Sequence, residues 1–257
     1  MASRTRRPTG EPRARRAPEA DALKAEFRRR LFLAAPRGEL EGLSDAHLDR
    51  LLDVAFETLA DREPGQHRIR LGNSESDGGN MRMPLVLVTD DMPFLVDSAT
   101  AAVTRAGLDI ERLLHPVVPI ERDSTGRLKS IGAEGMRESI IVMEVERAPA
   151  RKRAELIAEL EQVYADVRLA VGDWRAMLER LRFAARRLND SPPPVAPHVL
   201  AENIAFLEWL AAENFTLLGC HDSEGLKGIC RNPERFPLPP LAEGQAENPV
   251  LVGKSAL

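Results

Sequence analysis

Two adjacent carboxylates, Asp90 and Asp91, stand between a run of apolar residues and Pro93, where a strand is expected to pass into a helix. A pair of carboxylates at such a junction could act as a general acid and a general base. We favour a structural role, because a carboxylate at the start of a helix accepts hydrogen bonds from backbone N–H groups that have no partner within the helix.

The same loop offers a second kind of chemistry, which is the binding of a small anion. Backbone N–H groups at a helix N-terminus can hold a ligand carboxylate without performing a reaction on it. We therefore predict an effector-binding loop for an amino acid, formed by Asp90, Asp91, Met92, Pro93 and Phe94.

Metal and nucleophile chemistry find little support in the sequence. Cys220, His221 and Cys230 form the one cluster with soft metal ligands, and three ligands are too few for a closed zinc site. A buried structural thiol is the preferred interpretation of Cys220. No histidine stands at a motif spacing from a nucleophile, although a dyad could still form in space. We predict no catalytic residue and no metal site. The histidines are His47, His67, His115, His198 and His221.

Nucleotide-binding motifs are also missing from the sequence. No G-x-G-x-x-G follows a predicted strand. Gly253-Lys254-Ser255 resembles the end of a phosphate-binding loop, but Asn248 stands where that loop needs its first glycine. We predict no cofactor for this chain.

The bulk composition is that of an ordinary globular protein. The chain has 257 residues, of which 43% are hydrophobic, and a formal net charge of −4, so no overall field draws it to nucleic acid or to a membrane. No apolar run approaches the roughly 18–20 residues that span a bilayer. With only two cysteines, the chain is expected to be cytoplasmic.

The pattern around the loop predicts a small α+β module. An apolar strand at Pro84–Thr89 leads into a helix that runs to about Ala106, with Gly107 after its end. Two strands, a helix and a last strand follow, giving the order βαββαβ of a ferredoxin-like, four-stranded antiparallel sheet with both helices on one face. Glu144 and Glu146 are expected on the wet face of their strand. These four elements are Asp109–Arg122, Ser139–Glu146, Ala150–Tyr164 and Asp166–Asp173.

Other segments flank this module. Helices are predicted at about Ala20–Ala34, after Ser44, from Trp174 to Leu188 and from about His198, and a strand at Phe215–Cys220 with Gly225–Cys230 as its hairpin partner. The predicted domains are a disordered basic tail, a helical lead-in with a linker, the βαββαβ domain, a helix with a Pro-rich linker, and the start of a second α/β unit that is expected to be truncated. Their residues are 1–20, 21–80, 81–174, 175–197 and 198–257.

The string DDMPFLVDS at residues 90–98 resembles a motif of the large NAD-specific glutamate dehydrogenases of bacteria, at the start of an ACT-like domain. The resemblance covers most of residues 40–255. It implies that the chain is a fragment, or the product of a truncated reading frame, from the N-terminal regulatory region of a cytoplasmic enzyme of amino acid catabolism. The intact enzyme would oxidise L-glutamate with NAD. Shorter strings that agree in order begin at Gly107, His115, Arg137, Asn214, Gly225 and Pro249.

Three hypotheses about function follow from these observations. The first is a regulatory or assembly region of that dehydrogenase, not catalytic by itself, which self-associates through its sheet or helices. The second is a free-standing ACT-like module that senses an amino acid or binds a protein. The third, nucleic-acid binding through the Arg-rich tail, is not expected for so acidic a chain. Phe94 stands where ligand-binding ACT modules often have a glycine, so its side chain could fill the effector pocket.

Overall fold

The computed structural model describes residues 16–36, 38–77, 80–132, 134–222, 225–237 and 250–255. The chain divides into two compact units, described in turn below. The first unit comprises residues 1–91 and 103–157, and the second comprises residues 92–102 and 158–257. Most of the predicted basic tail lies outside the described residues, but its last five residues, from Arg16, are helical.

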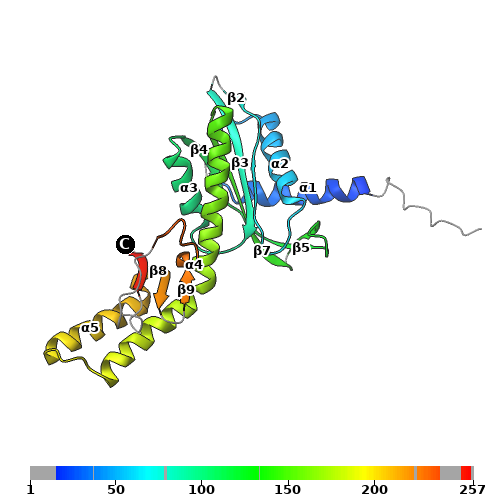
Figure 1. The fold of residues 1–257 in the computed structure, drawn as a ribbon. Coiled ribbons are helices and arrows are strands. Elements are labelled where there is room, and N and C mark those ends of the chain that lie inside the picture. Colours follow the sequence, from blue (N-terminus) through cyan, green and yellow to red (C-terminus); the bar gives the residue numbers. More distant parts are fainter. Residues whose placement is uncertain are drawn as a thin grey trace, which may run out of the picture. The chain divides into compact units, whose positions relative to one another are not determined.

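An antiparallel sheet is the centre of the first unit (Figure 1). β3 pairs with β7 along nine residues, from Arg82↔Glu146 to Asp90↔Glu138. The other edge of β7 pairs with β4 and β5, and β5 pairs with β6. The strands are β1 (Arg68–Leu71), β2 (Glu75–Asp77), β3 (Asn80–Asp90), β4 (Ile110–Leu114), β5 (Val117–Arg122), β6 (Leu128–Ile131) and β7 (Met136–Glu146).

Three sequence predictions for this sheet are confirmed. The apolar runs at Pro84–Thr89 and Ser139–Glu146 lie in β3 and β7. The irregular strand predicted at Asp109–Arg122 is present as β4 and β5, which are separated at His115 and Pro116. Pro116 cannot donate a backbone hydrogen bond, which explains the break in the strand.

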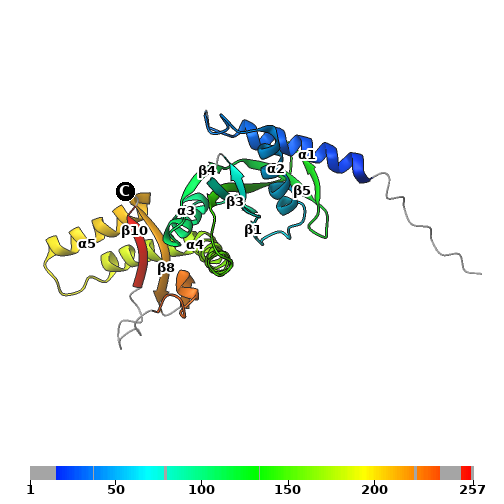
Figure 2. The ribbon, with the colours of Figure 1, turned by 90° about the horizontal axis from the view of Figure 1, so that it is seen from above.

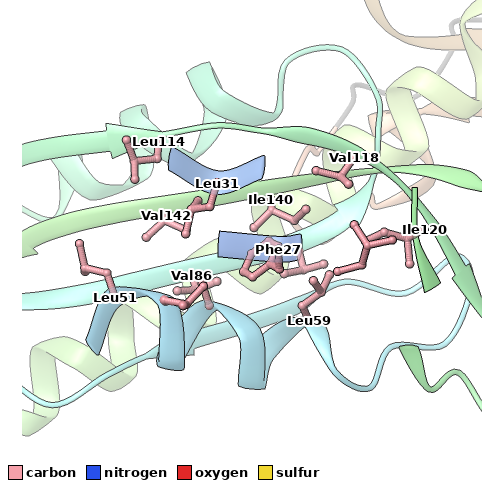
Figure 3. Packing of buried hydrophobic residues seen from close by; sticks show 14 residues of the cluster. Phe27, Leu31, Leu51, Leu59, Val86, Leu114, Val118, Ile120, Ile140 and Val142 are labelled. Atoms are coloured by element: carbon pink, nitrogen blue, oxygen red, sulfur yellow. The ribbon is translucent and has the colours of Figure 1, made fainter. Parts of the chain in front are cut away.

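Two helices cover one face of this sheet (Figure 2). α1 (Arg16–Leu33) and α2 (Asp45–Leu59) correspond to the predicted lead-in helices, and the hydroxyl of Ser44 accepts a hydrogen bond from the backbone N–H of His47, as expected for a cap. Alternate residues of the central strands face the helices, because side chains alternate across a strand. The packed residues include Phe27, Leu31, Leu51, Leu59, Val86, Leu114, Val118, Ile120, Ile140 and Val142 (Figure 3).

One edge of the sheet differs from the prediction. The strand predicted at Asp166–Asp173 is wrong, because these residues are helical within α4 (Ala150–Asp190). In a βαββαβ sheet a last strand would extend the edge beside the first one, which here is β3. β1 and β2 occupy that edge instead, both antiparallel to β3. The sheet therefore includes residues on both sides of the domain boundary that we predicted at residue 80.

The second unit contains most of α4 and most of α3, together with the C-terminal elements. α3 (Leu95–Arg105) ends where predicted, and Gly107 after it has a φ of 63°. α5 and the hairpin of β8 with β9 are also confirmed, and β10 pairs with the other edge of β8. These elements are α5 (Pro197–Trp209), the π-helical turn η2 (Leu210–Asn214), β8 (Phe215–Asp222), β9 (Gly225–Gly228), the 3-10 turn η3 (Ile229–Arg231) and β10 (Val250–Ser255).

A small core holds the second unit together. Met177 and Leu181 of α4 pack against Leu210, Leu217 and other buried side chains. The predicted helix from Trp174 to Leu188 is part of α4, so no break separates it from the helix predicted at Ala150–Tyr164.

Candidate functional site

The predicted effector loop lies between β3 and α3. Asp90 is the last residue of β3, and its Oδ1 accepts a hydrogen bond from Nη2 of Arg62 at 2.8 Å. Oδ2 of Asp91 lies 3.1 Å from Nε of Arg137. The helix begins only at Leu95, so neither carboxylate immediately precedes it. Both side chains are thus engaged by arginines of the first unit.

The Asp90 contact belongs to a buried group of charges at one end of the sheet, which we name the Arg62 cluster: Arg62, Asp90, Arg122 and Glu138. The Glu138 carboxylate lies between two guanidinium groups. Arg62 donates to it at 2.8 and 3.1 Å, and Arg122 donates to it at 2.7 and 2.8 Å. Two positive and two negative charges therefore meet in one place.

The remaining donors of the Arg62 cluster bond to backbone carbonyls. Nη1 of Arg62 donates to the carbonyl of Gln66 at 2.7 Å, and Arg122 donates to those of Leu59 and Gly126. Burial alone would lower the pKa of Arg62, but Glu138 and Asp90 raise it above its usual value. The cluster is paired internally, which fits a structural role better than a catalytic one.

A second buried ionic group lies midway along β7, and it corrects a sequence prediction. Glu144 was expected on a wet face, yet its side chain is buried. Nε2 of His47 lies 2.6 Å from its Oε1, and Arg112 pairs with its other oxygen. A cavity of about 180 Å³ adjoins this group and is lined in part by Arg50 and Arg82.

A histidine and a serine do meet in space, which sequence spacing did not reveal. Nε2 of His115 lies 2.8 Å from Oγ of Ser139. Burial lowers the pKa of His115, and the charge of Asp91 opposes that shift. Ser139 is completely buried in β7, so its hydroxyl cannot reach a substrate. The pair is therefore a structural hydrogen bond.

Phe94 adjoins an apolar cavity beside the predicted loop. Its φ of 72° is unusual for a bulky residue, and its carbonyl accepts the hydrogen bond of Ser98 in the first turn of α3. Pro93 and Phe94 line a cavity of about 440 Å³ together with Trp174 and Leu178 of α4 and Leu217 of β8. This volume lies in the range of ligand pockets, and the walls are mostly apolar.

The other sequence candidates lie apart from this cavity. Cys220 and Cys230 are buried and are not joined in a disulfide, and burial raises the pKa of Cys230. Gly253-Lys254-Ser255 lies in strand β10. Among the described residues, no group of three or more acidic, histidine or cysteine side chains is arranged to hold a metal ion. None of the helices in the described part is both long and apolar enough to cross a bilayer.

The five loop residues divide into two groups with different surroundings. Asp90 and Asp91 pair with arginines, whereas Pro93 and Phe94 line the apolar cavity and Met92 is partly exposed between them. The arginine partners, which the sequence analysis missed, lie 28 residues from Asp90 and 46 residues from Asp91 along the chain. No short-range pattern signals such a contact.

Comparison with known proteins identifies the protein family that the chain matches. A family model described as "Glutamate dehydrogenase, ACT1 domain" matches residues 27–160. The chain is 31% identical over 208 residues to the NAD-specific glutamate dehydrogenase of Halomonas elongata, covering 76% of this chain and 13% of that protein. It is also 31% identical over 167 residues to the NAD-specific glutamate dehydrogenase of Pseudomonas aeruginosa, covering 62% of this chain and 10% of the relative.

The chain thus spans about an eighth or a tenth of the length of these two relatives. The family match includes β3, the loop that carries DDMPFLVDS and the whole of β7, and the α+β, ACT-like fold agrees with it. The chain belongs to the family of glutamate dehydrogenases that carry the ACT1 domain.

Proposed function

We propose that this chain is a regulatory and assembly region of an NAD-dependent glutamate dehydrogenase, and that it is not catalytic by itself. The intact enzyme would convert L-glutamate and NAD to 2-oxoglutarate, ammonia and NADH. The names and lengths of the two relatives support this assignment. The free-standing ACT-like module is the alternative, and an enzyme-coding sequence in frame after this one would exclude it.

The observation that carries the regulatory part of the proposal is the cavity beside Phe94. A left-handed backbone at a bulky residue costs free energy and persists at sites where the surrounding structure holds it in place. The mostly apolar walls suit an apolar side chain. The N-terminus of α3, which follows directly, offers backbone N–H groups to a carboxylate. An amino acid with an apolar side chain combines both features.

Calorimetric titration with each of the common amino acids tests the effector. We expect one or more apolar amino acids to bind, and Val171→Trp, which places a large ring in the cavity, to abolish binding. The matched control is Leu226→Trp, because Leu226 is an exposed apolar residue outside the cavity. If none of the common amino acids gives a heat of binding, the effector proposal is wrong. Binding that survives Val171→Trp would also overturn it.

The catalytic part of the proposal has a separate test. We expect the purified chain to form no NADH from L-glutamate and NAD, as followed by absorbance. Steady NADH formation that persists through further purification would show that the chain is catalytic and would contradict the proposal.

A further inference from the structure

Three aromatic side chains gather at the cavity beside Phe94, in a chain that has few of them. Phe, Trp and Tyr together make up 4% of the sequence, yet Phe94, Trp174 and Phe215 all line this one cavity. They come from three different elements, which are the loop before α3, the middle of α4 and the first residue of β8. The fold therefore brings a scarce type of side chain together in one place.

Two of these rings still have surface to offer to a ligand. Phe94 is 36% exposed and Trp174 is 41% exposed, although both border an apolar cavity. Covering the exposed part of these rings is favourable, because apolar surface then leaves water. A ligand that reaches both rings gains from this burial.

The charge of the walls restricts the ligand further. The described residues that line the cavity include no charged side chain, and Thr216 supplies a hydroxyl. A ligand side chain with a full charge would lose its hydration there without gaining an oppositely charged partner. The walls therefore disfavour acidic and basic side chains, including that of glutamate, the substrate of the proposed enzyme.

The volume and the chemistry of the walls both favour a ring over an aliphatic side chain. The cavity measures about 440 Å³, whereas an apolar cavity of roughly 150 Å³ is large enough to take up benzene. A ring thus fits with room for the rest of an amino acid. Aromatic rings also attract one another beyond the area that they bury, and each pair that forms raises the affinity about two- to twelvefold.

We propose that the effector is an aromatic amino acid, whose ring lies among Phe94, Trp174 and Phe215. The inference deepens the regulatory part of the proposed function and rests on it. It narrows the ligand from apolar amino acids in general to those with a planar ring. The region would accordingly respond to aromatic amino acids and not to glutamate.

Calorimetric titration of the full chain with matched ligands tests the inference. We expect L-phenylalanine to bind at least about threefold more tightly than L-cyclohexylalanine, whose saturated ring is more apolar but forms no ring pair. L-Leucine should bind more weakly than L-phenylalanine by about tenfold or more. L-Glutamate should give no heat of binding at this site.

A pair of variants identifies the ring that contributes the preference. Trp174→Leu should lose most of the preference for L-phenylalanine over L-cyclohexylalanine. The matched control is Trp209→Leu, because Trp209 is similarly exposed and does not line the cavity, and it should keep the preference. Trp174 is partly exposed, so the circular dichroism of Trp174→Leu should match that of the natural chain.

Fluorescence provides a second readout. In Trp209→Phe, Trp174 is the one remaining tryptophan, and its emission should shift to shorter wavelength as L-phenylalanine covers the ring. An unchanged emission at saturation overturns the inference, as does a preference that survives Trp174→Leu.

The inference and the proposed function can fail separately. If leucine or cyclohexylalanine binds as tightly as phenylalanine, and Val171→Trp abolishes that binding, the aromatic inference is wrong and the effector proposal stands. If no amino acid binds at all, the effector proposal fails and the inference fails with it.

Discussion

The first unit buries two groups of paired charges, whereas the second unit contains an apolar helix, α5, that is exposed. In the first, Glu138 is buried between two arginines whose other donors reach backbone carbonyls, and Glu144 is buried between His47 and Arg112. In the second, α5 has no buried residue, and the aromatic rings of Phe206 and Trp209 are about half exposed.

This difference separates two uses of side chains. A buried ion pair contributes little net stability relative to apolar residues of the same shape, but it penalises any structure in which one partner is missing. It therefore favours one arrangement of the sheet over others. An exposed apolar helix adds little to the stability of its own unit, and its surface is available for association.

The largest expected effect tests whether the first unit depends on its enclosed charges. Glu138→Gln leaves Arg62 and Arg122 buried near a neutral amide, and we expect the free energy of unfolding to fall by about 3–5 kcal/mol. Urea denaturation measures the loss. The control is Glu155→Gln, which breaks the exposed pair with Arg151 and should cost less than about 1 kcal/mol. If the two variants lost similar amounts of unfolding free energy, the buried charges would be no more important to the first unit than the exposed ones.

A comparison of one apolar side chain from each unit sharpens the contrast. Leu59→Ala in the core beneath α2 should cost about 2–5 kcal/mol, because a cavity remains where the side chain was. Phe206→Ala should change stability by no more than about 0.5 kcal/mol when the chain is diluted enough to prevent association. A large loss for Phe206→Ala under those conditions would place Phe206 in the core of its own unit.

The backbone at Phe94 allows a test of strain in the second unit. Phe94→Gly and Phe94→Ala remove the same ring, but only glycine adopts a φ of 72° without steric cost. We expect the glycine variant to be the more stable by about 1 kcal/mol in urea denaturation, because a left-handed conformation costs other residues roughly 1–2 kcal/mol. Equal stability of the two would mean that the loop is not held in this conformation in solution.

The smallest effect concerns pH and the first unit. Burial lowers the pKa of His115 below the ordinary 6.5, so the unfolded chain takes up a proton at a higher pH than the folded chain does. The stabilisation is fully present above about pH 6.5 and is lost as the pH falls toward the lowered pKa. Urea denaturation at several pH values should show a weaker loss for His115→Asn. An unchanged pH dependence in this variant would assign the effect to another group.

Elements with strong local signals were predictable from the sequence. β3 and β7 are buried on both faces, so they appear as continuous apolar runs, and the Ser44 cap marks the start of α2. The strand predicted at Asp166–Asp173 failed because Val167, Leu169 and Val171 alternate by chance. The more deeply buried positions are Val163, Ala170 and Met177, which repeat every seven residues as in a helix.

Contacts between distant residues were not predictable. β1 is four residues long and half of it is charged, so nothing in its sequence marks it as a strand of this sheet. Glu144 was placed in water because alternation cannot show that α2 brings His47 over that face. The residues of the Arg62 cluster are likewise brought together by strand pairing, so their spacing along the sequence does not reveal the contact. The sequence analysis named Pro93 and Phe94, which line the apolar cavity, but it did not name the cavity walls at Trp174 and Leu217.

The Arg62 cluster has a consequence for the order of folding. Arg62 and Glu138 are 76 residues apart, so their contact requires closure of a long loop and the pairing of β3 with β7. We therefore expect the ionic contacts to form late in folding, after β3 has paired with β7. Interactions that are absent from the transition state slow unfolding while leaving the folding rate nearly unchanged. We accordingly expect the cluster to govern how long the sheet persists once folded more than how quickly it forms.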